Sequence, residues 1–290
     1  MSERTLVTGT SSGFGKLIVR GLLDAGHQVA ASMRDVGGRN AKPAAELRDA
    51  GAHIVELDVT DDESVERGVS AAAEGLGGLT ALVNNAGIGV TGLQESFTSA
   101  DFQRLFDINV FGVQRMNRAV MPRFREQRQG LLVYISSLLG RITIPFYGPY
   151  NASKWAVEAL AENYRAEVSG FGVESCIVEP GGYPTTFMDN LMRPSDRSRE
   201  PGYGEMATAP EATLKGFHDM LLASPEQDPS NVARTVVDLF GTRRGARPFR
   251  SVVDNIGMGA GVEPYNQAAQ ELTERIYSNM QISHMLELDG

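Results

Sequence analysis

Tyr150 and Lys154 are the two side chains in this sequence with the clearest capacity for acid–base chemistry. They stand four residues apart in a stretch, residues 150–169, that is predicted to be helical, so both would lie on one helical face. A free tyrosine has a pKa of ~10, too high for a base near neutrality, but a neighbouring ammonium group favours the phenolate. The pair predicts a proton-transfer site, with an ordinary surface Tyr/Lys pair as the alternative.

A third polar group suited to chemistry is a serine hydroxyl at the end of a predicted strand. Ser136 and Ser137 follow the apolar run at residues 131–135, which places them at the carboxyl edge of a sheet. Side chains alternate along a strand, so only one of the two hydroxyls can face a site at that edge.

Three glycines suit the binding of a phosphate. Gly9, Gly13 and Gly15 follow an apolar run at residues 5–8 and open a helical pattern at residues 14–25. A turn of this kind lets a pyrophosphate approach backbone N–H groups and the positive end of the helix. The spacing, Gly-x3-Gly-x-Gly, predicts a dinucleotide site, and an ordinary turn is the alternative.

These groups must be positioned by a repeated alternation of strands and helices. Short apolar runs predict strands at residues 5–8, 28–33, 53–57, 81–83, 131–135 and 173–178. Helical patterns occupy residues 14–25, 43–50, 61–74, 101–126 and 150–169. Strands apolar on both faces predict an α/β fold, a Rossmann-type doubly wound parallel sheet with its ligands at the carboxyl edge.

The length of 290 residues suits a single domain. Residues 1–182 are predicted to form the dinucleotide-binding and catalytic core, and residues 183–228, rich in Pro, Gly, Ser and Met at first, a substrate lid. Residues 229–290 are expected to hold C-terminal helices and the last strand, with an amphipathic helix within 264–285.

Composition limits the partners that we expect. The net charge of −9 disfavours nucleic acid. We find no secretion signal, no membrane-spanning run and no metal-ligating pattern. The single cysteine, Cys176, lies in an apolar run and suits a reducing compartment, so we expect a cytoplasmic protein.

Taken together, the glycine turn, Asn84-Asn85-Ala86-Gly87, Asn109, Ser137 and the Tyr150/Lys154 pair resemble the classical branch of the short-chain dehydrogenase/reductase family over residues 4–186. The resemblance implies an oxidoreductase that moves a hydride between a nicotinamide dinucleotide and an alcohol or ketone. A silent dinucleotide-binding or sensor protein, and a lyase or epimerase of the extended branch, are the alternatives.

The resemblance also assigns catalytic roles. Tyr150 would be the general acid in reduction and the base in oxidation, and Lys154 would hold the nicotinamide ribose. Ser137, thirteen residues before Tyr150, would polarise the reacting oxygen, which leaves Ser136 as a structural residue. Asn109 would kink its helix and position a water bonded to the lysine.

For the cofactor, the resemblance predicts contacts along the whole dinucleotide, with Asp58 at the adenine and the Pro180-Gly181 backbone at the carboxamide. The residues expected to contact it are Gly9, Ser11, Ser12, Gly13, Phe14, Gly15, Arg34, Asp58, Val59, Asn85, Ala86, Gly87, Tyr150, Lys154, Pro180, Gly181, Tyr183 and Thr185. Tyr183 and Pro184 depart from the residues usual in the family.

The end of the second predicted strand bears on the choice of cofactor. Met33 stands where NAD-preferring relatives carry an acidic residue, and Arg34 follows it, where a guanidinium can bind a 2′-phosphate. We therefore expect NADP(H) to be preferred over NAD(H). Asp35 is adjacent and can neutralise Arg34, and Arg34 as a solvated loop charge is the alternative.

Two further expectations concern the substrate and the assembly. Apolar side chains near the predicted active edge and lid indicate a fairly large hydrophobic alcohol or carbonyl compound. They are Phe146, Tyr147, Trp155, Tyr183, Phe187, Met188, Met192 and Met206, of which Trp155 fits a packing role better. By resemblance, the helices at 101–126 and 150–169 would pair in a homodimer or homotetramer.

Overall fold

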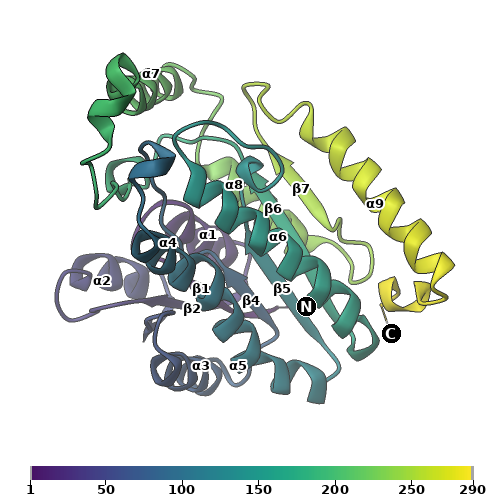
Figure 1. Ribbon diagram of the computed structural model, residues 1–290. Helices are drawn as coiled ribbons and strands as arrows, with labels where there is room; N and C mark the ends of the chain where they lie inside the picture. The colour runs from purple at the N-terminus through teal and green to yellow at the C-terminus, as the bar shows by residue number, and fades with distance from the viewer. Residues whose placement is uncertain (1, 289–290) are drawn as a thin grey trace.

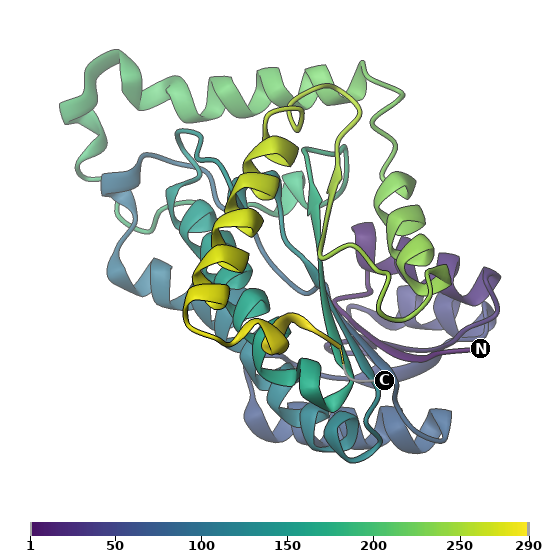
Figure 2. The same cartoon turned by 90° about the vertical axis from the view of Figure 1, so that its right-hand side faces the viewer.

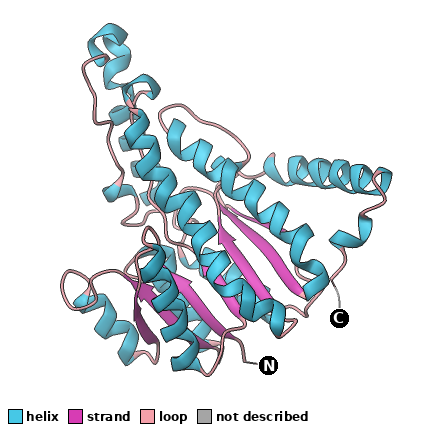
Figure 3. Ribbon diagram, turned by 60° about the horizontal axis from the view of Figure 1, so that its bottom comes forward, coloured by secondary structure: helices cyan, strands magenta, loops and turns pink. Residues whose placement is uncertain are grey.

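Seven parallel strands form the one sheet that we find in the computed structural model, which describes residues 2–288. The strands are β1 (Arg4–Thr8), β2 (Gln28–Met33), β3 (His53–Glu56), β4 (Ala81–Asn84), β5 (Gly130–Ile135), β6 (Val173–Pro180) and β7 (Arg250–Val253). Their order is β3-β2-β1-β4-β5-β6-β7, and the sheet lies between layers of helices (Figure 3). The chain reverses its direction of winding between β1 and β4, where doubly wound sheets bind their ligands.

Helices cover both faces of the sheet (Figure 1). One layer contains α3 (Asp62–Leu76), α4 (Ser99–Phe106), α5 (Gly112–Glu126) and α6 (Gly148–Val168), and the other contains α1 (Gly13–Asp24), α2 (Ala41–Asp49) and α8 (Ser230–Gly241). Alternate side chains of each strand enter separate cores: Leu82 packs on one side and Val83 on the other, both fully buried. This is the predicted Rossmann-type single domain.

The helix expected over residues 101–126 is interrupted in the structure. α4 ends at Phe106, a π-helical turn covers Asp107–Phe111, and α5 begins at Gly112. Asn109 lies in the π turn, and its side chain donates to and accepts from the backbone of Ile88. This paired contact with the loop after β4 accompanies the widened turn, and such local turns are frequent at functional sites.

The part of the chain after β6 builds one end of the molecule. Two 3-10 segments, Met188–Asn190 and Glu200–Thr208, lead into α7 (Ala209–Leu222), which projects across the top of the molecule (Figure 2). α9 (Val262–Asn279) runs beside β7 and overlaps most of residues 264–285, the stretch predicted to contain an amphipathic helix. Among residues 2–288, no helix is both long enough and apolar enough to cross a bilayer.

Candidate active site

A cavity of about 530 Å³ opens at the carboxyl edge of the sheet, at the switch between β1 and β4. Every residue predicted to contact the dinucleotide lines it, and so does Ser137. The cavity extends from Arg34 and Asp58, after β2 and β3, past the glycine turn to Tyr150 on α6. The topology therefore brings together side chains that are more than 100 residues apart in sequence.

The glycine turn leaves room for a ligand on its open side. Gly9 and Gly13 have backbone φ angles of 70° and 53°, which residues other than glycine rarely adopt. A Cβ on Gly13 would meet only the Thr185 side chain, at 4.0 Å, whereas a Cβ on Gly15 would overlap the Gly9 carbonyl oxygen. Gly15 thus permits close packing of α1 on the turn, and Gly13 keeps the cradle open at the helix N-terminus.

The loop after β4 is fastened to this turn by Thr8 and Asn85. The Thr8 hydroxyl accepts hydrogen bonds from the backbone N–H groups of Asn85 and Ala86, each at 3.0 Å. The Asn85 amide donates to the carbonyl oxygens of Thr8 and Gly9, at 2.8 and 3.0 Å. Sequence reasoning missed Thr8, whose signal is a polar residue at the carboxyl end of an apolar strand.

The far end of the cavity carries two arginines. Arg34 lies 3.5 Å from the Asp58 carboxylate and is half exposed. Although partial burial opposes the change, hydrogen bonds from Thr60 and the neighbouring Arg34 lower the pKa of Asp58. Asp35, the neighbour that could have neutralised Arg34, instead lies 3.9 Å from Arg39. Arg39 also lines the cavity, and sequence reasoning did not select it.

Tyr150, Lys154 and Ser137 meet at the near end of the cavity. The Lys154 ammonium lies 5.5 Å from the centre of the Tyr150 ring and donates to the Ile135 carbonyl at 2.8 Å. Burial raises the pKa of Tyr150, and the Ser137 hydroxyl opposes that rise. Burial thus favours the protonated form of the phenol.

Asn109 does not line the cavity, but it contacts Ile88, which does. Its side chain is buried and bonds the Ile88 backbone and the Ser153 hydroxyl, the latter at 3.1 Å. Ser153 precedes Lys154 on α6, so Asn109 connects the loop after β4 to the helix that carries the Tyr/Lys pair. Protein groups already satisfy its amide, which leaves less capacity for the water contact suggested by the resemblance.

The comparison with known proteins agrees with this geometry. Residues 3–196 match the family model described as short chain dehydrogenase. The chain belongs to the short-chain dehydrogenase family. Retinol dehydrogenase 8 from Bos taurus is 36% identical over 251 residues, which cover 82% of this chain and 78% of that protein.

Two other relatives bear on the function of this short-chain dehydrogenase. A 3-ketodihydrosphingosine reductase from Bacteroides thetaiotaomicron is 37% identical over 185 residues, which are 64% of this chain and 65% of that protein. The solved structure of a variant of actinorhodin polyketide ketoreductase with NADPH is 28% identical, with a TM-score of 0.72 over 89% of this chain and 97% of that one.

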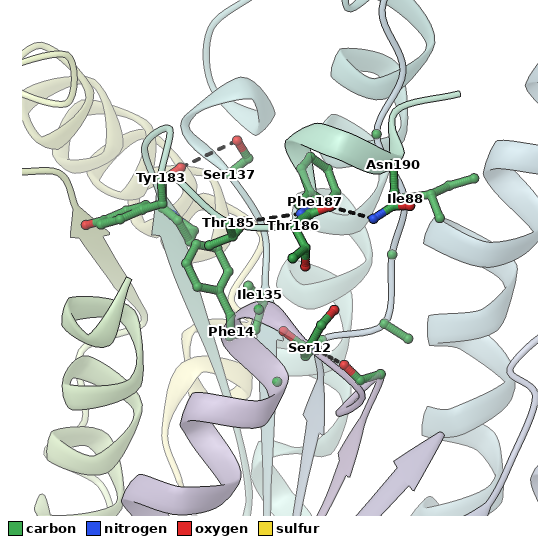
Figure 4. Close-up of a pocket in the computed structure, with 18 of the residues that line it drawn as sticks. Ser12, Phe14, Ile88, Ile135, Ser137, Tyr183, Thr185, Thr186, Phe187 and Asn190 are labelled. Atoms are coloured by element: carbon green, nitrogen blue, oxygen red, sulfur yellow. Dashed lines mark hydrogen bonds between the residues drawn. The ribbon is translucent and has the colours of Figure 1, made fainter. Parts of the chain in front are cut away.

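Tyr183, which departs from the residues usual in the short-chain dehydrogenases, has a structural place. Its ring packs edge-on against Phe14 at 5.4 Å, and its hydroxyl donates to the Val253 carbonyl at 3.2 Å. Figure 4 shows the rings of Phe14 and Tyr183 side by side, with Ser137 near the same loop. Tyr183 thus joins the turn after β6 to α1 and β7, and its side chain is buried.

The substrate end of the short-chain dehydrogenase is only partly the one predicted. Tyr147, Tyr183, Phe187 and Met188 line the cavity, together with residues that sequence reasoning missed: Leu139, Ile142, Ile144, Phe217 and Met258. The other four predicted residues, Phe146, Trp155, Met192 and Met206, do not line it. Trp155 and Met206 are exposed instead, and Met192 packs on a small cluster around Val90. Residue type alone did not reveal which side chains turn inward.

Proposed function

We propose that this protein is an NADP(H)-preferring oxidoreductase that interconverts a hydrophobic alcohol and its ketone or aldehyde. The observation that carries the proposal is one continuous cavity with the Ser137, Tyr150 and Lys154 side chains at one end and the glycine turn and Arg34 at the other. A dinucleotide fits the donors present, because the open cradle at Gly13 suits a pyrophosphate and Arg34 suits a 2′-phosphate.

The side chains at the near end suit proton transfer. When bound, a nicotinamide would supply or accept the hydride. Tyr150, protonated in its buried position, would donate its phenolic proton to the substrate oxygen in reduction and recover it in oxidation. The Ser137 hydroxyl would donate to the same oxygen and stabilise its developing charge. Lys154 would hold a positive charge behind the phenol and favour loss of its proton.

The lining of the cavity supports a fairly large apolar substrate. Ile142, Ile144, Phe187 and Met188 surround the space beside the Tyr/Lys pair. Two of the relatives carry names that refer to long apolar molecules, retinol and ketodihydrosphingosine. Residues 183–228 would act as the lid, since Phe187 and Phe217 from this stretch line the cavity.

We expect oxidation of NADPH with large apolar ketones or aldehydes and little with small polar sugars, because burial of apolar surface contributes about 25 cal/mol per Å². The experiment is a spectrophotometric screen of ketone, steroid, quinone and sugar panels, with NADH in parallel. Activity confined to sugars would contradict the hydrophobic substrate. No oxidation with any panel, although both cofactors bind, would contradict the proposed reaction.

We also propose that the protein self-associates through α5 and α6. Phe111, just before α5, and Trp155, on α6, are large apolar side chains with 51% and 38% of their surface exposed. Sedimentation at micromolar concentration is expected to give a dimer or tetramer, and Phe111→Glu to shift it towards the monomer. A wild type that sediments only as monomer would exclude this assembly.

A further inference from the structure

A cluster of charges, all of them buried except the partly exposed Glu162, begins one helical turn beyond Lys154. Tyr150, Lys154, Glu158 and Glu162 repeat every four residues on α6, so the stripe that carries the proposed acid continues into two carboxylates. Glu158 is 2% exposed, and Glu179, the residue before Pro180 at the end of β6, is fully buried. Buried carboxylates are costly unless they are paired, so their partners matter.

Arg250, at the start of β7, pairs with all three carboxylates of the cluster. Its Nε lies 3.0 Å from Glu158 Oε2 and 3.3 Å from Glu179 Oε1, and its Nη2 donates to Glu162. The guanidinium is itself buried. One cation thereby connects α6, β6 and β7 directly behind the cavity.

Asn266 of α9 closes the cluster from the C-terminal side. Its Nδ2 donates to Glu179 Oε2 at 2.6 Å, and its Oδ1 accepts from Arg141 Nε at 2.7 Å. Arg141 follows β5, close in sequence to Ser137, and also lies 3.9 Å from Glu162. Hydrogen bonds of Asn266 thus tie α9 to the end of β6 and to the segment after β5.

The Glu158 carboxylate has a second neighbour in Ser136. A Cβ on Gly140 would lie 3.2 Å from Glu158 Oε1 and 2.9 Å from Ser136 Oγ, so this oxygen and the Ser136 hydroxyl face the same small space. The Ser136 hydroxyl acts against the rise in the pKa of Glu158 that burial causes. Because the other oxygen, Oε2, binds Arg250, the carboxylate is held in place from both sides.

The buried ammonium of Lys154 needs a counter-charge. The Ile135 carbonyl that accepts its hydrogen bond carries no net charge, and neither does the Asn109 side chain of the π turn. The charged and titratable groups around Lys154 and Glu158 are Tyr150 and Glu162 on α6, Arg141 after β5, Glu179 on β6 and Arg250 on β7. Asp107, in the π turn, is paired with Arg115. Glu158 is therefore the carboxylate placed to balance Lys154.

We propose that Glu158 is a positioning residue of the active site: held by Arg250, its carboxylate keeps the Lys154 ammonium charged behind Tyr150. The catalytic consequence rests on the function proposed above, whereas the effect on the charge of Lys154 does not. Six ionisable groups take part, and when ionised the cations Lys154, Arg141 and Arg250 balance the carboxylates Glu158, Glu162 and Glu179.

The titration behaviour of these groups agrees with the proposal. Burial lowers the pKa of Lys154 to about 8, and the charge of Glu158 opposes that fall. Burial raises the pKa of Glu179 to about 7, and also raises that of Glu158. Removing the charge of Glu158 should lower the pKa of Lys154 further.

The experiment observes Lys154 directly, without substrate or cofactor. The sequence contains only Lys16, Lys42, Lys154 and Lys215, so protein labelled with ¹³C-lysine gives four side-chain signals, and Lys154→Met identifies the one of interest. We expect this signal to titrate near pH 8 in the wild type. In Glu158→Gln it should titrate about one pH unit lower or more. Glu162→Gln, the same change one turn further on, is the matched control and should shift it less.

Two outcomes would overturn the proposal: a Lys154 midpoint unchanged in Glu158→Gln, or an equal shift in Glu162→Gln. If Glu158→Gln does not fold, as judged by circular dichroism, Glu158→Asp replaces it. This variant moves the carboxylate away by one methylene, so it should lower the Lys154 midpoint by less than Glu158→Gln would. An unchanged Lys154 midpoint in Glu158→Asp would also overturn the proposal. In active protein, the alkaline limb of the pH–rate profile should move with the Lys154 midpoint. If Glu158→Gln shifts the Lys154 midpoint as expected but the wild type turns over no substrate, the result counts against the proposed function alone.

Discussion

Replacing Tyr150 by Phe is expected to lower turnover by about 10²–10⁴-fold while cofactor affinity stays close to that of the wild type. The change removes the transferable proton and keeps the ring. That ring contacts Phe187 at 5.8 Å between centroids and lies beneath the Lys154 ammonium, so its packing should persist. The measurement is kcat with the best substrate from the screen, together with the dissociation constant of NADPH.

Tyr164→Phe is the matched control for this prediction. Tyr164 lies on the same helix, and its hydroxyl donates to Gln114 at 3.0 Å, away from the cavity. Its loss should cost about 1 kcal/mol of stability and leave turnover near the wild-type value. If Tyr150→Phe keeps the kcat of the wild type, the hydroxyl is not the proton donor and the proposed chemistry is wrong.

Removing Arg34 is expected to weaken NADP(H) binding by about ten- to a hundredfold and to leave NAD(H) binding almost unchanged. The estimate follows from about 1.5–3 kcal/mol for a hydrogen bond to a charged group. Met33→Asp should act in the opposite sense, because a carboxylate repels a 2′-phosphate and accepts hydrogen bonds from a ribose. Dissociation constants of both cofactors at fixed ionic strength measure the two effects.

Asp58 and Arg39 make this second prediction sharper than the sequence allowed. Arg34 pairs with Asp58 at 3.5 Å, so a 2′-phosphate has to compete with that carboxylate. Arg39 lines the same end and provides the comparison variant, Arg39→Ala. If only Arg39→Ala selectively loses affinity for NADP(H), Arg39 and not Arg34 is the residue that recognises the 2′-phosphate. An equal loss of both cofactors in Arg34→Ala would show that Arg34 supports the loop and does not select the cofactor.

Much of the framework was accessible from the sequence because its signals are local. The six predicted strands agree with the observed ones to within two residues at either end, since each is a short apolar run bounded by turn residues. The helical pattern did not show the interruption at Asp107–Phe111, although the resemblance implied a kink at Asn109, because the widened turn depends on Asn109 meeting the Ile88 backbone 21 residues away. The range of β7 also escaped prediction, because its four residues carry an arginine whose charge is neutralised only by distant carboxylates.

The amino-acid sequence by itself determined the fold class, the family and the order of the groups that line the cavity, because these depend on spacing within single turns, strands and helices. Only the tertiary structure decided which side chains share an environment. Arg34 pairs with Asp58, not with its neighbour Asp35, and Glu158 meets Arg250 across 92 residues. The physical reason is that desolvation and ion pairing depend on distances between elements, which are set when the sheet and its helices pack together.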